Sequence, residues 1–303
     1  MVAAFSSCGC VSSTPNDEQT VETTTTTTTE ATTEETTTNA DTEVIDPADD
    51  IMTDDGIVAD DTTPDISENQ TDEAAYASSY IISKIGWGLG AERDNDNRPL
   101  DAVSAQEKYK ALDACFLPDG KKICLTFDEG YENGYTAEIL DILKEKGVKA
   151  VFFVTYDYCK SAPELVKRMI DEGHTVGNHS YSHPSFPDLS ENEIIDEVMA
   201  LHDYVAENFG YEMSLFRFPK GEFSEGTLNF VKSLGYTSVF WSFAYNDWDT
   251  HSQPDKASAL EKIKASTHSG IYLLHAVSET NAAILGEVID HWKAEGYEVG
   301  SEL

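Results

Sequence analysis

The stretch that most constrains the fold is a short apolar run that ends abruptly in two acids and a glycine. Residues 123–127 are mainly apolar or β-branched, and Asp128 and Glu129 follow them directly. Such a run predicts a buried strand that delivers two carboxylates to its C-terminal edge. A helix is predicted next, from an N-cap at Thr136 to a terminating Gly147. Strand, acidic turn and helix in this order are typical of α/β enzymes, although a plain turn and helix cap is the alternative for the two acids.

The same alternation of strand and helix continues to the C-terminus. Further strands are predicted at residues 149–154, 175–178, 215–218, 237–241 and 271–274, and further helices at 163–173, 190–210, 227–234, 256–267 and 281–295. Ser190 and Glu193 are predicted to form a capping box at the start of one of these helices. Repeated βα units imply parallel strands with right-handed crossovers, in an open sheet or a barrel. We therefore assign residues 76–303 to one α/β domain.

The charge of the chain is strongly negative and unevenly distributed. Its 303 residues include 56 acidic and 20 basic ones, which gives a formal net charge of −36. The first 75 residues hold 19 of the acids and no Lys or Arg. Such a surface repels phosphate groups, which argues against a nucleic-acid partner. It also repels anionic lipid, so we expect membrane association only through a tether.

The N-terminal quarter of the chain is predicted to lack a core. Residues 11–75 are rich in Thr and acids, and low hydrophobicity with charge of one sign indicates a disordered linker. Residues 1–10 place small residues before Cys8 and Cys10, which resembles the remnant of a lipoprotein-type signal; an ordinary frayed terminus is the alternative. The lipoprotein interpretation places the protein at the cell surface, lipid-anchored to the outer face of a bacterial membrane.

Chemically competent side chains fall at the ends of the predicted strands. They are Asp128 and Glu129 after the first strand, His179 and His183 after the third, Arg217 on the fourth, Asp247 after the fifth and His275 at the end of the sixth. Each has a plain structural alternative as a surface loop residue, an ion-pair partner or a core histidine. The carboxyl ends of parallel strands meet at one edge, so together these residues indicate an active site.

His179 and His183 are spaced to hold a metal. Two imidazoles four residues apart can bind one ion, and Pro184 disfavours helix at the second, so a tight turn is expected. With one carboxylate from a neighbouring strand they would form a facial set of three ligands with open positions for water and substrate. This set suits Zn²⁺ or another divalent transition metal in hydrolysis.

Five motifs occur in order along the chain. They are Thr126-Phe127-Asp128-Glu129-Gly130, His179-Ser180-Tyr181-Ser182-His183, Arg217-Phe218-Pro219-Lys220-Gly221, Asp247-Trp248 and Leu273-Leu274-His275. From residue 87 to residue 303 the chain resembles the polysaccharide deacetylase (NodB-homology) family, carbohydrate esterase family 4. The run from Tyr131 to Thr136 resembles the delta-lactam-biosynthetic branch, which acts on N-acetylmuramic acid in peptidoglycan. The resemblance implies an α/β fold, a distorted barrel of about seven parallel strands.

The resemblance also implies catalytic roles. Asp128 would be the general base that activates water, and Arg217 would pair with it and keep it ionised. His275 would be the general acid that protonates the leaving amine, and Asp247 would help to set its protonation.

A second group would bind metal and substrate. His179, His183 and Glu129 would be the metal ligands, although the family usually has Asp where this chain has Glu129, so the longer side chain would ligate in altered geometry or swing away. Residues that would line the substrate groove are Tyr131, Trp248 and Leu273, with Trp87 and Trp241 as further candidates; a role as core aromatics is the alternative for the rings.

Lys220 is expected to bind a negatively charged group of the substrate. It would contact the lactyl carboxylate of muramic acid, unless it is solvated or pairs with Glu222 or Glu225. The expected activity is metal-assisted removal of N-acetyl groups from peptidoglycan by a monomer. The alternatives are deacetylation of N-acetylglucosamine, chitin-type or other polysaccharides, and a non-catalytic glycan-binding surface lipoprotein.

Overall fold

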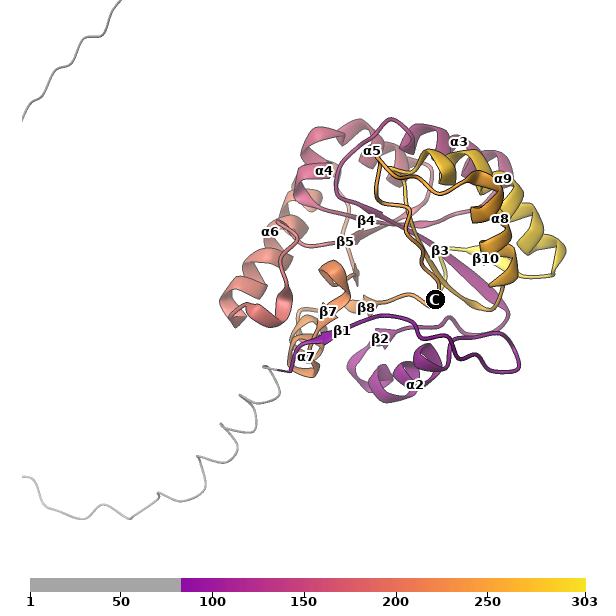
Figure 1. Cartoon of the computed structure of the whole chain (residues 1–303). Coiled ribbons are helices and arrows are strands. Elements are labelled where there is room, and N and C mark those ends of the chain that lie inside the picture. The colour runs from indigo at the N-terminus through magenta and orange to yellow at the C-terminus, as the bar shows by residue number, and fades with distance from the viewer. Residues whose placement is uncertain (1–82) are drawn as a thin grey trace, which may run out of the picture. The chain divides into compact units, whose positions relative to one another are not determined.

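Residues 83–303 are described by the structure, a computed structural model in which helices surround a curled parallel sheet (Figure 1). The signal remnant predicted at 1–10, the linker at 11–75 and the first residues of the predicted domain lie outside the described residues. Across residues 83–303, no helix combines the length and the apolar character needed to cross a bilayer.

The main sheet has eight strands, in the order β10-β3-β4-β5-β6-β8-β2, with β9 pairing on β3. The bounds are β2 (Ala114–Cys115), β3 (Lys122–Glu129), β4 (Val151–Val154), β5 (Thr175–Asn178), β6 (Leu215–Phe216), β8 (Thr237–Val239), β9 (Gly270–His275) and β10 (Glu298–Gly300). Every pairing in this sheet is parallel, as the βα alternation predicts.

The sheet curls into a distorted barrel because β9 also contacts the chain that follows β8. A parallel bridge joins Phe243 to Tyr272. The backbone N–H of Ser242 donates to the carbonyl of Ile271 over 2.8 Å, and that of Leu273 donates to the carbonyl of Phe243 over 2.9 Å. The predicted barrel of about seven parallel strands is confirmed, with short β10 as an addition at the start of β3.

Helices pack around the outside of this sheet (Figure 1). They are α2 (Leu100–Tyr109), α3 (Thr136–Lys146), α4 (Tyr156–Ser161), α5 (Pro163–Asp171), α6 (Glu191–Phe209), α7 (Glu225–Ser233), α8 (Lys256–Ala265) and α9 (Glu279–Ala294), with 3₁₀ turns η1 (Lys110–Leu112), η2 (Phe186–Asp188) and η3 (Pro219–Gly221). Strands β1 (Ile85–Gly86) and β7 (Glu222–Phe223) form a small antiparallel pair. Sequence patterns missed α2, α4, β1, β2, β7 and β10.

Helix ends follow local capping chemistry. The predicted capping box at Ser190 and Glu193 is confirmed, and Gly147 terminates α3 with a φ of 64°. The prediction of Thr136 as N-cap is wrong: the cap is Tyr135, and the Thr136 hydroxyl instead donates to Glu132. Helix α7 begins earlier than predicted because Ser224 caps it.

Successive residues of β3 point to opposite faces of the sheet. Phe127 faces the helices and stacks on Phe152 with ring centroids 5.2 Å apart. Cys124 belongs to a separate inner cluster, which also contains Val151, Phe153, Val239 and Ile271. The alternation therefore puts Asp128 on the inner face, while Glu129 shares the outer face with Phe127.

Gly177 on β5 permits close packing inside the barrel. A Cβ at this position would lie 2.5 Å from Cδ1 of Phe153, well inside van der Waals contact. Only glycine therefore fits without a shift of the Phe153 ring, which itself packs against Arg217, 4.2 Å from the guanidinium carbon to the ring centroid.

Candidate active site at the carboxyl ends of the strands

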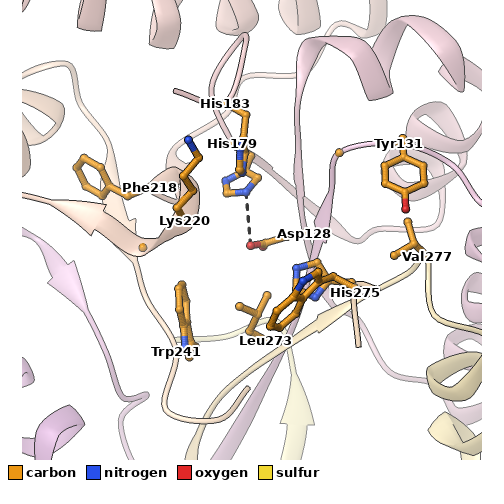
Figure 2. Close-up of a pocket in the computed structure, with 13 residues that line it drawn as sticks. Asp128, Tyr131, His179, His183, Phe218, Lys220, Trp241, Leu273, His275 and Val277 are labelled. Atoms are coloured by element: carbon orange, nitrogen blue, oxygen red, sulfur yellow. Dashed lines mark ion pairs between the residues drawn. The ribbon is translucent and has the colours of Figure 1, made fainter. Parts of the chain in front are cut away.

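A cavity of about 510 Å³ opens where the barrel strands end (Figure 2). Its lining residues are Asp128, Gly130, Tyr131, His179, His183, Phe218, Lys220, Gly221, Trp241, Trp248, Leu273, His275 and Val277. Residues far apart in the sequence meet here because parallel strands deliver their C-terminal ends to the same edge. Of the residues predicted from the sequence, only Glu129, Arg217, Asp247 and Trp87 do not line the cavity wall.

Asp128 and Arg217 form a buried ion pair beneath the cavity. Nη1 of Arg217 donates to Oδ1 of Asp128 over 2.8 Å and to Oγ1 of Thr126 over 2.8 Å. The remaining donors are directed to backbone carbonyls, with Nε 3.0 Å from the oxygen of Val239. Burial alone would raise the pKa of Asp128, but the charges of Arg217 and the nearby histidines outweigh it and lower that pKa. Asp128 is thus an ionised carboxylate.

His275 and Asp247 form a second pair on the other side of the cavity. Nδ1 of His275 lies 2.7 Å from Oδ1 of Asp247, and the His275 backbone N–H donates to Oδ2 over 2.9 Å. Asn281 on α9 donates to the same Oδ2 over 2.6 Å. Burial lowers the pKa of His275, but the hydrogen bond and charge of Asp247 more than offset it, so the pKa rises above 6.5. The carboxylate of Asp247 therefore stabilises the protonated form of the ring.

The contact with Asn281 was not predicted from the sequence. Asn281 is buried on α9, where its Nδ2 also donates to the carbonyl of His275 over 3.1 Å and its Oδ1 accepts from Tyr245. A buried polar residue near the start of an amphipathic helix was the available signal, but nothing in the sequence names its partner.

His179 and His183 stand on the opposite wall from His275, with ring centroids 4.8 Å apart. Nδ1 of His179 donates to the carbonyl of Arg217 over 2.8 Å, which leaves Nε2 unprotonated and 3.5 Å from Oδ2 of Asp128 (Figure 2). Burial lowers the pKa of His179, and burial together with the charge of His179 lowers that of His183 to about 4. Both rings are neutral near pH 7, the form that binds a metal.

Glu129 lies away from the two histidines with which it was predicted to bind a metal. It does not line the cavity, it is fully buried, and neither of its carboxyl oxygens has a hydrogen-bond partner within residues 83–303. Burial, with the nearby Glu132 and Asp128, raises its pKa well above the ordinary value of 4.5. Because it follows Asp128 on the strand, its side chain points to the outer face. Of the two possibilities stated for this longer side chain, the structure has the one in which Glu129 is turned away from the cavity and is not placed as a ligand.

The fit of a metal to this cavity is therefore partial. In the described part of the chain, no group of three or more His, Cys, Asp or Glu side chains is arranged to hold an ion. The two neutral imidazoles of His179 and His183 do fit two positions of a divalent transition metal, in keeping with the ligand chemistry of imidazole.

The rim of the cavity carries exposed aromatic rings. Tyr131 is 51% exposed and Trp248 is 52% exposed, and the Trp248 ring lies 5.8 Å from that of His275. Trp241 also lines the cavity. Trp87 does not: its Nε1 donates to the carbonyl of Trp241 over 2.9 Å and its ring packs on Phe116, so its predicted place in the groove is wrong.

Lys220 lines the cavity without an ion-pair partner in residues 83–303. It is exposed, adopts a φ of 59°, and extends on the same side as His183 in Figure 2. The two acids considered as its partners are engaged elsewhere, since Glu222 pairs with Lys84 over 3.2 Å and Glu225 pairs with Lys108 over 2.9 Å.

Known proteins share both the sequence and the fold. A sequence model described as polysaccharide deacetylase matches residues 118–239. Peptidoglycan-N-acetylmuramic acid deacetylase PdaA of Bacillus subtilis is 42% identical over 232 residues, which cover 74% of this chain and 86% of that protein. Peptidoglycan-N-acetylglucosamine deacetylase PgdA of Listeria monocytogenes is 33% identical over 237 residues, 76% of this chain and 50% of that protein.

The structural comparison agrees with the sequence comparison. The structure of B. subtilis PdaA, a family 4 carbohydrate esterase, superposes with a TM-score of 0.68 and 39% identity, covering 72% of this chain and 94% of that one. Each of the five motifs contributes at least one residue to the lining of this cavity, whereas the side chain of Glu129 points away from it. This chain belongs to the polysaccharide deacetylase family, carbohydrate esterase family 4, whose members are hydrolases.

Proposed function

We propose that this protein removes N-acetyl groups from the N-acetylmuramic acid residues of peptidoglycan, with a divalent metal, expected to be Zn²⁺, as cofactor. The proposal rests on the pKa values of two groups at one cavity, which are shifted in opposite directions. The pKa of Asp128 is lowered and that of His275 is raised. When the surroundings shift two pKa values in opposite directions, one group can act as the base and the other as the acid of the same reaction.

The residues suggest how the amide is cleaved. Arg217 occupies Oδ1 of Asp128, so Oδ2 is the oxygen left to accept a proton from water. Protonated His275 donates its Nε2 proton to the departing amine, while Asp247 holds the ring through Nδ1. When bound at His179 and His183, a divalent metal supplies a Lewis acid for the acetyl carbonyl.

The rim supports a sugar substrate with a negative charge. Exposed Tyr131 and Trp248 offer flat apolar faces against which pyranose rings can pack, and Leu273 adds an apolar side chain to the cavity lining. Lys220 supplies a cation that forms no ion pair within residues 83–303, which suits the lactyl carboxylate of muramic acid once the stem peptide is removed. The name of the B. subtilis relative points to the same sugar.

Acetate release from defined glycans tests the proposal. The wild-type protein, loaded with Zn²⁺, is expected to release acetate from peptide-stripped muramic glycans faster than from N-acetylglucosamine oligomers. Preferential release from the glucosamine oligomers would instead assign the activity named for the Listeria relative.

A second candidate function is binding without catalysis. It is favoured by one observation, the position of Glu129 away from the cavity, which leaves two histidines as metal ligands. A fold does not guarantee activity, so a decayed site would leave a glycan-binding protein. Retention on peptidoglycan with no acetate release, at any Zn²⁺ concentration tried, would support this function and contradict the first.

The proposed substrate implies a place outside the cytoplasm. We infer that the protein acts at the cell surface as a monomer, and that lipid attached at Cys8 or Cys10 tethers it to the membrane. Support for the tether comes from the sequence of residues 1–10 alone. Loss of membrane association in a Cys8→Ala/Cys10→Ala variant is the expected result, and unchanged association would contradict the tether.

A further inference from the structure

The turn that carries the two histidines is held in an unusual backbone conformation. Ser180 has a φ of 69° and His183 a φ of 60°, both in the left-handed region that non-glycine residues rarely adopt. Each such residue costs on the order of 1 kcal/mol or more and persists only where surrounding contacts determine it. The question is which contacts hold this turn in place.

Two contacts lie within the turn itself, because Oδ1 of Asn178 accepts from the Ser180 N–H over 2.8 Å and Oγ of Ser180 accepts from the His183 N–H over 2.9 Å. The contacts from outside the turn come from the middle of α6. The carboxylate of Glu197 accepts two hydrogen bonds from Ser182, one from its backbone N–H to Oε2 over 2.8 Å and one from its hydroxyl to Oε1. The backbone carbonyl of Glu197 accepts a third bond, from the N–H of Tyr181 over 2.9 Å. One residue of α6 therefore binds both residues that lie at the centre of the turn.

Glu197 does not belong to the cavity itself. It is absent from the cavity lining, and it lies half-buried on α6, next to the exposed Asp196. Its effect on the cavity must therefore pass through the turn, since Ser182 is the direct neighbour of His183. Glu197 lies outside the five family motifs, since it falls between the second, which ends at His183, and the third, which begins at Arg217.

We propose that Glu197 is a positioning residue that sets the geometry of His179 and His183 for metal binding. This inference rests on the proposed metal dependence. With Glu129 turned away from the cavity, two imidazoles must provide the protein's hold on the ion, so their relative position matters more than in a site with three ligands. Partners that orient metal ligands in this way typically contribute 10- to 100-fold in metal affinity.

Two substitutions separate positioning from charge. Glu197→Ala removes both side-chain bonds to Ser182, while alanine keeps the helix because it is the best helix former. Glu197→Gln removes the charge but preserves two bonds, since its carbonyl accepts from the Ser182 N–H and its amide donates to the hydroxyl. Asp196→Ala, at the exposed neighbouring position, is the matched control.

Zn²⁺ binding to the metal-free full chain, measured by calorimetry, is the first readout. We expect Glu197→Ala to raise the Kd at least 10-fold, with Glu197→Gln and Asp196→Ala within about 3-fold of wild type. Hydrogen exchange is the second readout: the amide of Ser182 should exchange faster in Glu197→Ala alone, because it loses its acceptor, while the amide of Tyr181 keeps its bond to the Glu197 backbone carbonyl. At saturating Zn²⁺ the kcat of Glu197→Ala should return towards the wild-type value, although its Kd stays raised.

Other outcomes separate this inference from the proposed function. Equal Zn²⁺ affinity of Glu197→Ala and wild type would overturn the positioning role while leaving metal dependence intact. Equal weakening by Glu197→Ala and Glu197→Gln would also overturn it, because the effect would then be one of charge. A wild-type chain that takes up no Zn²⁺ would overturn the metal dependence, and the positioning role with it.

Discussion

Replacing Asp247 by Asn should damage the acid of the reaction while leaving the base unchanged. Asp247 is fully buried, and its Oδ1 lies 2.7 Å from Nδ1 of His275. Its Oδ2 accepts from the His275 N–H and from Asn281, so the Asn side chain will keep its oxygen towards those two donors. The new amide NH₂ then faces Nδ1 of His275, which can no longer hold a proton there.

The magnitude follows from the bond that is lost. A hydrogen bond to a charged group contributes about 1.5–3 kcal/mol. Since each 1.36 kcal/mol corresponds to a factor of ten in rate, the loss predicts a fall in kcat/KM of about 10- to 150-fold near neutral pH. The fall should grow with pH, because the substitution also lowers the pKa of His275.

The direction of the pH effect can be stated for both rate and stability. In the proposed mechanism activity needs protonated His275, so it should decline as pH rises through the raised pKa of His275, and in Asp247→Asn this alkaline limb should move to lower pH. The raised pKa also stabilises the fold. That contribution is complete below the ordinary pKa of 6.5 and is lost as pH rises through the folded value, so the variant should lack this pH dependence.

The assay is the pH dependence of kcat/KM for acetate release, with urea unfolding at pH 6 and pH 9 as the stability measurement. Asp249→Asn is the matched control, since Asp249 lies in the same loop but binds the backbone N–H of His251 instead of His275. A profile for Asp247→Asn that coincides with wild type in position and height would refute the assignment of His275 as the acid.

Three further predictions concern metal, substrate and packing. Chelation should abolish activity and added Zn²⁺ should restore it, because the two neutral histidines are the proposed ligands of the ion; full activity in protein shown to be metal-free would contradict this. Lys220→Ala should lower kcat/KM on muramic substrates by about 10- to 100-fold and spare N-acetylglucosamine oligomers, whereas equal losses on both would make Lys220 structural. Gly177→Ala should destabilise the protein by about 1–3 kcal/mol in urea unfolding, because its Cβ would meet the Phe153 ring; unchanged stability would show that the ring moves freely.

The main elements of the barrel were predictable because each has a strong local pattern. The apolar run before Asp128 and the capping box at Ser190 both specify their element without help from the rest of the chain. The two-residue strands β1, β2 and β7 carry no such pattern, since two residues show no periodicity, and their partners are chosen by tertiary contacts.

The site was predictable to the extent that it depends on strand ends. Asp128, His179 and His275 meet because β3, β5 and β9 are parallel and end at one edge. The direction in which the Glu129 side chain points was not predictable from the sequence. It depends on whether β3 continues for one more residue or turns at Asp128. The partners Asn281 and Glu197 could not be predicted at all, since both act from helices whose registry against the strands is set by the folded core.

The most direct test of the proposed chemistry is acetate release from peptide-stripped muramic glycan by wild type and by Asp128→Asn, both loaded with Zn²⁺. Asn is nearly the same size as Asp but cannot accept the proton from water, so kcat should fall by about 10²- to 10⁴-fold. Circular dichroism should confirm that the variant is folded. Release by Asp128→Asn at a rate near that of wild type would contradict the role of Asp128 as the base at this cavity.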